Sequence, residues 1–312
     1  ERGFLVVLLA GLFVVCSQGE VLADYHPDAK KTGLDADPCP LNPDGGFFIF
    51  TPGAGIPGHM EWRVLGSLQY VDSPLTVVKD GEVLRELVSM RFEARVGGVL
   101  GLWKVLEVGL TVPATVYQES RYAGYKLGEA GSAGVGSIQL FSKVKVAGDG
   151  DSGIALFLPL GFPTVTDTGY MGLDGWSFTP TAAAARRLGD FVSSFSFGYR
   201  LQSNSTLFNI RDYDRMFSGL AVAYRPEEGV VDLALETMGS VPADDPLATM
   251  DHVGIEVNAV LGLRLGNWTL RFGGGKGLTE GYSTPDFRGF FQLQYSGVPN
   301  PDRDGDQHCE KR

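Results

Sequence analysis

Few residues have a spacing that could carry chemistry, and the clearest lie near the C-terminal end. Asp302, Asp304 and Asp306 alternate in the run DRDGD. Alternating carboxylates supply the oxygen ligands that Ca²⁺ takes in proteins. We therefore expect weak Ca²⁺ binding through these three aspartates, with a solvated acidic tail as the other interpretation.

A glycine motif and the histidines argue against other chemistry. Residues 53–58 read GAGIPG and match the dinucleotide pattern GxGxxG. That pattern works only where a helix N-terminus follows the glycines, whereas Pro57 is followed here by a strand-like segment. His26, His59, His252 and His308 have no metal-ligand spacing and form no recognisable Ser-His-Asp set. We expect no enzymatic activity and no cofactor beyond Ca²⁺.

Most other charged residues alternate with apolar ones along the chain. Between residues 87 and 98, Met90 and Phe92 interleave with Arg91, Glu93 and Arg95. A period of two is typical of strands, and a helix would spread the same charges over all its faces. The pattern predicts twelve strands, at residues 61–70, 87–98, 106–117, 135–146, 153–164, 176–187, 191–200, 217–225, 230–237, 252–264, 268–274 and 287–296.

Strand length and loop length together indicate the fold class. Most of the predicted strands have about ten residues, which is the length a tilted strand needs to cross a bilayer, whereas soluble strands have about 5–6. Short turns alternate with long polar loops, as in outer-membrane barrels with short periplasmic turns and long extracellular loops. We predict an all-β, antiparallel, twelve-stranded transmembrane β-barrel. A β-sandwich or a lipocalin-like barrel remains the soluble alternative.

The cost of charge in lipid decides which face points inward. A cation facing lipid at mid-depth costs about 2–4 kcal/mol, and the opposite face of these strands is apolar, with aromatic residues near the strand ends. We therefore expect the charged face to line the lumen. Its predicted residues are Arg63, Arg91, Glu93, Arg95, Glu107, Lys143, Lys145, Arg200, Asp232, Glu236, Glu256, Arg264, Arg271 and Arg288.

Composition and the first residues place the chain in an export pathway. The protein has 312 residues, a net charge of -11 and 3 cysteines. Its acidity argues against nucleic-acid binding, and its mean hydropathy of +0.02 argues against a bundle of membrane helices. Residues 4–15 are an apolar run of signal-peptide length. We predict a signal peptide at 1–23, a periplasmic leader at 24–60 that has no fold of its own over residues 24–44, a barrel at 61–297 and an Asp-rich linker at 298–312.

The last predicted hairpin carries a family resemblance. The stretches GNW at 266–268, GYSTPDFR at 281–288 and PNPDRDGD at 299–306 resemble the OmpA-family proteins of myxobacteria, as does LPLGFPT at 158–164. In those proteins a transmembrane barrel precedes a thrombospondin type 3-like linker and a peptidoglycan-binding domain. The resemblance implies that this chain stops just inside the linker, so it implies peptidoglycan binding only for a form that carries the further domain.

These observations lead to two functional hypotheses. The first is a structural barrel of the Gram-negative outer membrane, monomeric and in contact with outer-membrane lipid. The second is a small pore or uptake channel that prefers anions, because the predicted lumen has more cations than acids. We also consider a disulfide between Cys39 and Cys309, which both flank the barrel on the periplasmic side.

Overall fold

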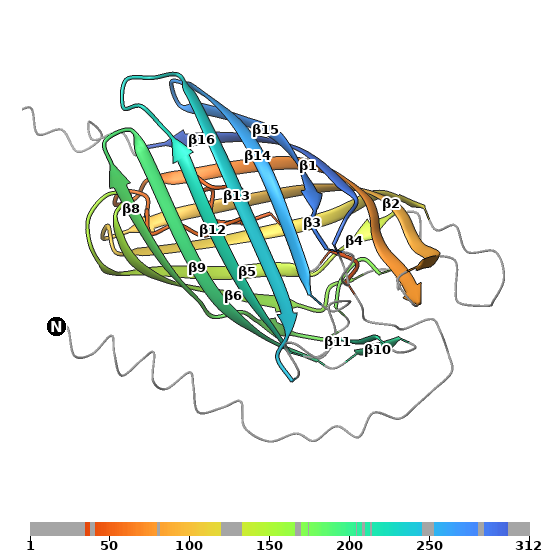
Figure 1. Ribbon diagram of the computed structural model, residues 1–312. Coiled ribbons are helices and arrows are strands. Elements are labelled where there is room, and N and C mark those ends of the chain that lie inside the picture. The colour runs from red at the N-terminus through yellow and green to blue at the C-terminus, as the bar shows by residue number, and fades with distance from the viewer. Residues whose placement is uncertain are drawn as a thin grey trace, which may run out of the picture.

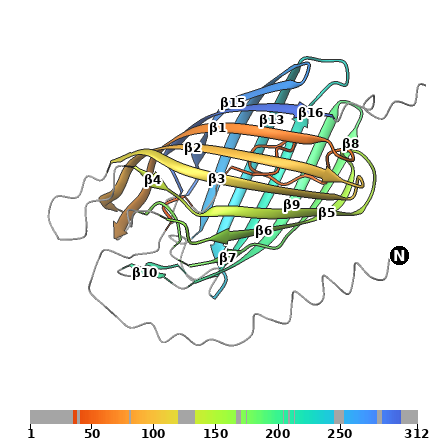
Figure 2. The ribbon, with the colours of Figure 1, turned by 180° about the vertical axis from the view of Figure 1, so that it is seen from behind.

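The computed structural model shows a single closed barrel (Figures 1 and 2). It describes residues 35–37, 41–79, 82–119, 133–165, 170–173, 175–203, 205–207, 210–212, 214–244, 253–279 and 284–298. Across these ranges there is no helix with the length and apolar character needed to cross a membrane.

The barrel wall consists of antiparallel strands that follow one another around the sheet. They are β1 (Trp62–Lys79), β2 (Glu82–Leu102), β3 (Leu106–Glu119), β4 (Gly134–Val135), β5 (Ile138–Ala147), β6 (Gly153–Phe162), β7 (Ser177–Phe178), β8 (Thr181–Leu188), β9 (Phe191–Gln202), β12 (Arg215–Tyr224), β13 (Val231–Pro242), β14 (Gly254–Leu265), β15 (Trp268–Gly277) and β16 (Phe287–Gly297). The remaining described strands, β10 (Ser205–Leu207) and β11 (Ile210–Asp212), form a small separate hairpin.

The wall has twelve strand positions, because the short strands β4 and β7 each share one position with the strand that follows them. The pair β4 and β5 both bond to β3, and the pair β7 and β8 both bond to β6 and β9. The first and last strands then join from Trp62↔Gly297 to Asp72↔Phe287. This pairing confirms the predicted all-β, twelve-stranded antiparallel barrel.

The interruption between β7 and β8 has a local cause. Pro180 lies between the two strands, and Pro159 of the neighbouring strand β6 lies opposite this gap. Proline has no N–H to donate to a ladder. The carbonyl of Pro159 still accepts a bond from the Thr179 N–H at 3.0 Å, so the sheet stays continuous across the break.

The first hairpin is much longer than the sequence pattern predicts. We expected a long loop between the predicted strands at 61–70 and 87–98, but β1 has 18 residues and β2 has 21, with register shifts between Asp72 and Val78. Strands of this length exceed the roughly 9–11 residues needed to cross a bilayer. The hairpin therefore projects beyond the barrel on the side of the long loops, which we call the long-loop end (Figure 1). The opposite side is the short-turn end.

The outer surface of the wall is apolar. Val96, Val116, Leu220 and Leu235 are all more than half exposed, and they alternate along their strands with buried residues. Near the short-turn end Tyr295 packs between Trp62 and Trp268, with ring centroids 5.5 and 4.8 Å away. An apolar band bordered by aromatic rings is the surface that lipid requires.

The most important departure from the sequence prediction lies inside the barrel. Residues 35–37 and 41–60, which we call the lumen segment, were expected to belong to the periplasmic leader. Leu41, Ile49 and Phe50 are instead buried among inward-facing wall residues, and the ribbon of the segment lies inside the barrel (Figure 1). The described part of the expected leader is thus an internal element, held by the buried contacts described below.

Candidate channel lumen

The lumen segment runs through the barrel from end to end. Asp35 and Asp37 lie near residues of β16 and β2 at the long-loop end. At the other end the Met60 N–H donates to the Gly101 carbonyl at 2.7 Å, beside the short turn after β2. A Cβ added at Gly101 would lie 2.3 Å from the Gly58 carbonyl oxygen, so only glycine allows the segment to pass this close.

Asp37 is the strongest attachment at the long-loop end. Arg288 donates to both of its carboxylate oxygens, at 2.7 and 2.9 Å, and Gln69 donates to one of them at 3.0 Å. Arg288 also holds Glu256 through two bonds of 2.9 and 3.2 Å. Arg288 is fully buried, so both bidentate pairs are removed from water.

Asp35 makes a second, weaker attachment close to the mouth. Its carboxylate lies 3.2 Å from Nη1 of Arg91. The other nitrogens of Arg91 donate to the Tyr170 carbonyl, through Nη2, and to Gln118, through Nε. Partial burial raises the pKa of Asp35 to about 6, although Arg91 pulls it down. Burial also acts on Asp37, but there the charge and hydrogen bonds of Arg288 prevail and lower the pKa. The two aspartates therefore titrate in different pH ranges.

Asp44 is buried in the middle of the lumen. Its carboxylate accepts a bond from Lys143 Nζ at 2.7 Å, and Lys143 lies 3.3 Å from Glu107. All three side chains are at most 1 % exposed. The segment therefore places a carboxylate on a buried wall lysine, as Asp35 and Asp37 do on arginines.

One attachment has the reverse polarity, because the wall supplies the acid. The Glu236 carboxylate on β13 accepts three backbone N–H bonds of 2.8, 3.0 and 2.9 Å from Ile49, Phe50 and Thr51. Three consecutive N–H groups that converge on one anion form a nest. Residues 49–51 take this conformation against the fully buried Glu236.

Apolar packing fills the space between these polar contacts. Phe48 packs on Val192, Ala221 and Ala223, whereas Ala54 packs on other small wall residues. The inward positions of β8, β9 and β12 hold mostly alanine, serine and glycine. Small side chains on this wall leave room for the aromatic residues of the segment.

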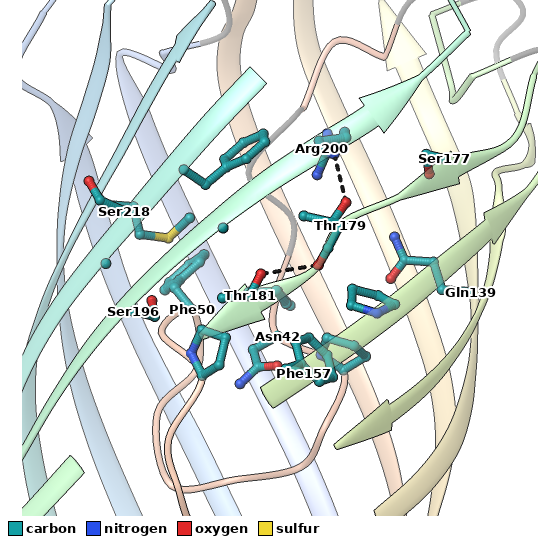
Figure 3. A pocket seen from close by; sticks show the side chains of 18 of the residues that line it. Asn42, Phe50, Gln139, Phe157, Ser177, Thr179, Thr181, Ser196, Arg200 and Ser218 are labelled. Atoms are coloured by element: carbon teal, nitrogen blue, oxygen red, sulfur yellow. Dashed lines mark hydrogen bonds between the residues drawn. The ribbon is translucent and has the colours of Figure 1, made fainter. Parts of the chain in front are cut away.

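Cavities remain beside the segment, and two of them are bordered by arginines. The first lies between residues 41–52 and the strands β5, β6, β8, β9, β12 and β13 (Figure 3). Arg200 donates to Thr179 Oγ1 at 3.3 Å on its border, and its guanidinium lies 4.5 Å above the Phe217 ring. The second cavity lies at the short-turn end, beside Arg63, Arg225 and Arg271.

The fourteen predicted lumen residues occupy inward positions of varying depth. Ten are buried, namely Arg91, Glu93, Arg95, Glu107, Lys143, Asp232, Glu236, Glu256, Arg271 and Arg288. Arg63, Lys145, Arg200 and Arg264 are half-buried. Several pair within the wall, as Arg95 does with Glu93 at 2.8 Å and Arg264 with Asp232 at 3.1 Å.

The sequence prediction missed the aspartates of the segment and two wall arginines. Arg215 and Arg225 continue the inward set Phe217, Ala221 and Ala223 with the same period of two. Extending the pattern by one step in each direction would have found both. The apolar run FFIF at 47–50 was the signal for the segment, because such a run needs burial.

The proposed calcium and disulfide residues lie elsewhere. Asp302, Asp304, Asp306, Cys39 and Cys309 are outside the residues that the structure describes. Within the described ranges, His, Cys, Asp and Glu form no group of three or more that could hold a metal ion.

Comparison with known proteins places the fold. No family model matches the chain, and no curated protein matches it in sequence. The COG4313 outer membrane channel from Pseudomonas putida F1 is similar in structure, with a TM-score of 0.64 and 15% identity over 79% of this chain and 99% of that one. The Pseudomonas putida toluene transporter TodX has a TM-score of 0.42 and 10% identity over 86% of this chain and 98% of its own.

The fold is therefore that of Gram-negative outer-membrane β-barrel proteins. At this level of identity the similarity establishes the architecture alone.

Proposed function

We propose that this protein is an outer-membrane channel for small polar solutes, closed in the present conformation by its lumen segment. The observation that carries the proposal is the nature of the contact between segment and wall. Asp35, Asp37 and Asp44 meet wall cations, and Glu236 meets backbone N–H groups. The charged side chains of the wall can be hydrated once the segment moves away, whereas a wall that only packs against the segment would be apolar.

The similarity to a solved outer membrane channel supports the same proposal at the level of the fold. The charge of the wall indicates a preference for anions. Nine of the fourteen predicted lumen residues are cations and five are acids, whereas the described part of the segment has three aspartates and no lysine or arginine. Movement of the segment would leave the wall with an excess of positive charge.

A structural barrel of the OmpA type, located in the outer membrane, is the second candidate. The buried ion pairs favour it, since a locked interior needs no solute. The peptidoglycan-binding and calcium-binding parts of that hypothesis concern residues beyond 298 and stay as expectations.

A reversible cross-link distinguishes the two candidates. A Cβ added at Gly219 would lie 3.0 Å from Thr51 Oγ1, and the Sγ of one cysteine lies about 3 Å from the Cβ of the other in a disulfide. Thr51→Cys with Gly219→Cys, in a chain with Cys39→Ser and Cys309→Ser, should therefore tie the segment to β12. Each single cysteine variant is the matched control.

Single-channel conductance in planar bilayers gives the readout. A gated channel should show opening events in the reduced double variant and both controls, and should lose them on oxidation of the double variant alone. If the reduced protein never opens, or if the cross-linked protein conducts as well as the reduced one, the segment is not a gate. The first outcome would favour the structural barrel.

A further inference from the structure

The cavity at the short-turn end differs from the rest of the lumen in its charge. It has a volume of about 290 Å³ and lies between the glycine-rich parts of the segment and the wall strands β1, β15 and β16. The segment lines it with Gly45, Gly46, Gly53 and Gly55 and with the rings of Phe47 and Phe48. From residues 45–56 the segment brings no carboxylate to this cavity.

Arg271 borders this cavity and is 95 % buried, with 5 % of its surface exposed. Its Nη1 donates to the side-chain oxygens of Gln292 and Gln294, at 2.8 and 3.1 Å. Its Nε has no hydrogen-bond partner. Among the described residues Arg271 has no carboxylate within ion-pair distance, so one edge of a buried guanidinium is left open.

Two more arginines border the same cavity. Arg225 has a buried Nε without a partner, and its nearest acid is Asp151 at 3.8 Å. Asp151 binds Arg187 more closely, at 2.9 Å. Arg63 is better satisfied, with Glu61 at 3.1 Å and the Gly45 carbonyl at 3.2 Å. Arg271 and Arg225 therefore each keep a buried Nε–H without a partner, and both side chains border this cavity.

Buried charge without a partner is costly, and an anion in the cavity would remove that cost. The open edge of a guanidinium presents two parallel N–H donors, which match two oxygens of a carboxylate or a phosphate. The cavity reaches Asp151, whose side chain is 36% exposed, so a small solute can enter from the short-turn end.

We propose that this cavity is a binding site for a small oxyanion, a carboxylate or a phosphate, held by Arg271 and Arg225. The proposal deepens the channel function by naming the class of solute, and it rests on that function only for the claim that the anion is transported. Binding itself requires the cavity and the two arginines.

Calorimetric titration of the full chain in detergent tests the site, with inorganic phosphate and acetate as separate probes in a weakly coordinating buffer. We expect saturable binding of at least one probe. Arg271→Gln and Arg225→Gln should each weaken it by about tenfold or more, the effect of losing a charged hydrogen bond. Arg271→Lys should lie between them and the parent, because it keeps the charge and loses the fork.

Arg200→Gln is the matched control, because Arg200 faces the other cavity. This variant should bind the probe with the affinity of the parent. Heat-modifiable gel migration shows that each variant is folded. Binding that persists at parental affinity in both folded glutamine variants would overturn the site, as would the absence of binding in the parent. Neither result depends on conductance, so failure of this site is distinguishable from failure of the gate.

Discussion

The two halves of the lumen differ in whether their buried wall cations are paired with acids of the lumen segment. At the long-loop end and in the middle, wall cations are paired with Asp35, Asp37 and Asp44 of the lumen segment. At the short-turn end the segment offers glycine and phenylalanine, and Arg271 and Arg225 face a cavity. One half therefore holds the segment in place, whereas the other is left open for a solute.

The largest effect should come from the centre of the paired half. Arg288→Met leaves Asp37 and Glu256 buried without a cation, and loss of one partner of a buried ion pair costs about 3–5 kcal/mol. Hydrogen exchange of amides in residues 41–54 should therefore accelerate by more than about a hundredfold. Arg288→Lys, which keeps the charge, is the control and should accelerate exchange less. Equal protection in all three proteins would show that this pair does not hold the segment.

The nest at Glu236 should give the next largest effect. Glu236→Gln removes the charge and one accepting oxygen from three N–H bonds, and each hydrogen bond to a charged group contributes about 1.5–3 kcal/mol. We expect the amides of Ile49, Phe50 and Thr51 to lose roughly tenfold or more of their protection, measured residue by residue. Asp232→Asn is a suitable control, because Asp232 is a buried acid that pairs with Arg264 of the wall. Faster exchange of these three amides in the control alone would show that Glu236 does not hold them.

A smaller effect should follow pH, through Asp35. With the segment held in the barrel, the pKa of Asp35 is raised to about 6. With the segment released, Asp35 returns to its ordinary pKa of 3.8, so between these two values the held state binds one more proton. The attachment is therefore strongest below the ordinary pKa and weakens as pH rises through about 6. Solvent at the mouth screens the group, so the change is about 1 kcal/mol.

This pH effect is measurable as a difference between two proteins. After correction for intrinsic exchange rates, the parent segment should be better protected at pH 5 than at pH 7, and Asp35→Asn should lack that part of the change. A segment that loosens on acidification only in the parent would mean that the ion pair with Arg91 dominates instead.

The smallest effect on the segment should come from the open half. Arg225→Gln loses a 3.8 Å contact to Asp151 and a cation–π contact at 4.7 Å to Phe47. Exposed contacts of both kinds contribute up to about 1 kcal/mol. Protection of residues 41–54 should change by less than about fivefold, while anion affinity falls by about tenfold or more. Release of the segment as large as in Arg288→Met would erase the distinction between the two halves.

The wall was predictable because a strand exposes its period in the sequence. Twelve expected strands match the twelve of the barrel, and even the alternation of Arg91, Glu93 and Arg95 matches their burial. The long first hairpin was missed because turn-forming residues interrupt this stretch, as in DSP at 72–74 and DG at 80–81. Pairing between β1 and β2 keeps residues 71–79 and 82–84 extended.

The lumen segment could not be predicted, because its order depends on contacts far away in the sequence. Asp37 is 251 residues from Arg288, and Ile49 is 187 residues from Glu236. The segment has no periodic pattern of its own, and the N–H groups of Ile49, Phe50 and Thr51 bond to a wall side chain instead of a neighbouring strand. Its three aspartates therefore look like solvated charges until the barrel closes around them.

The amino-acid sequence is enough to identify the class of fold and the inward direction of the charged face, because alternation and the cost of charge in lipid are local properties. Which of those charges are neutralised depends on the closed barrel. Closure of the wall sets the distance between each cation and the segment, and that distance separates paired Arg288 from open Arg271.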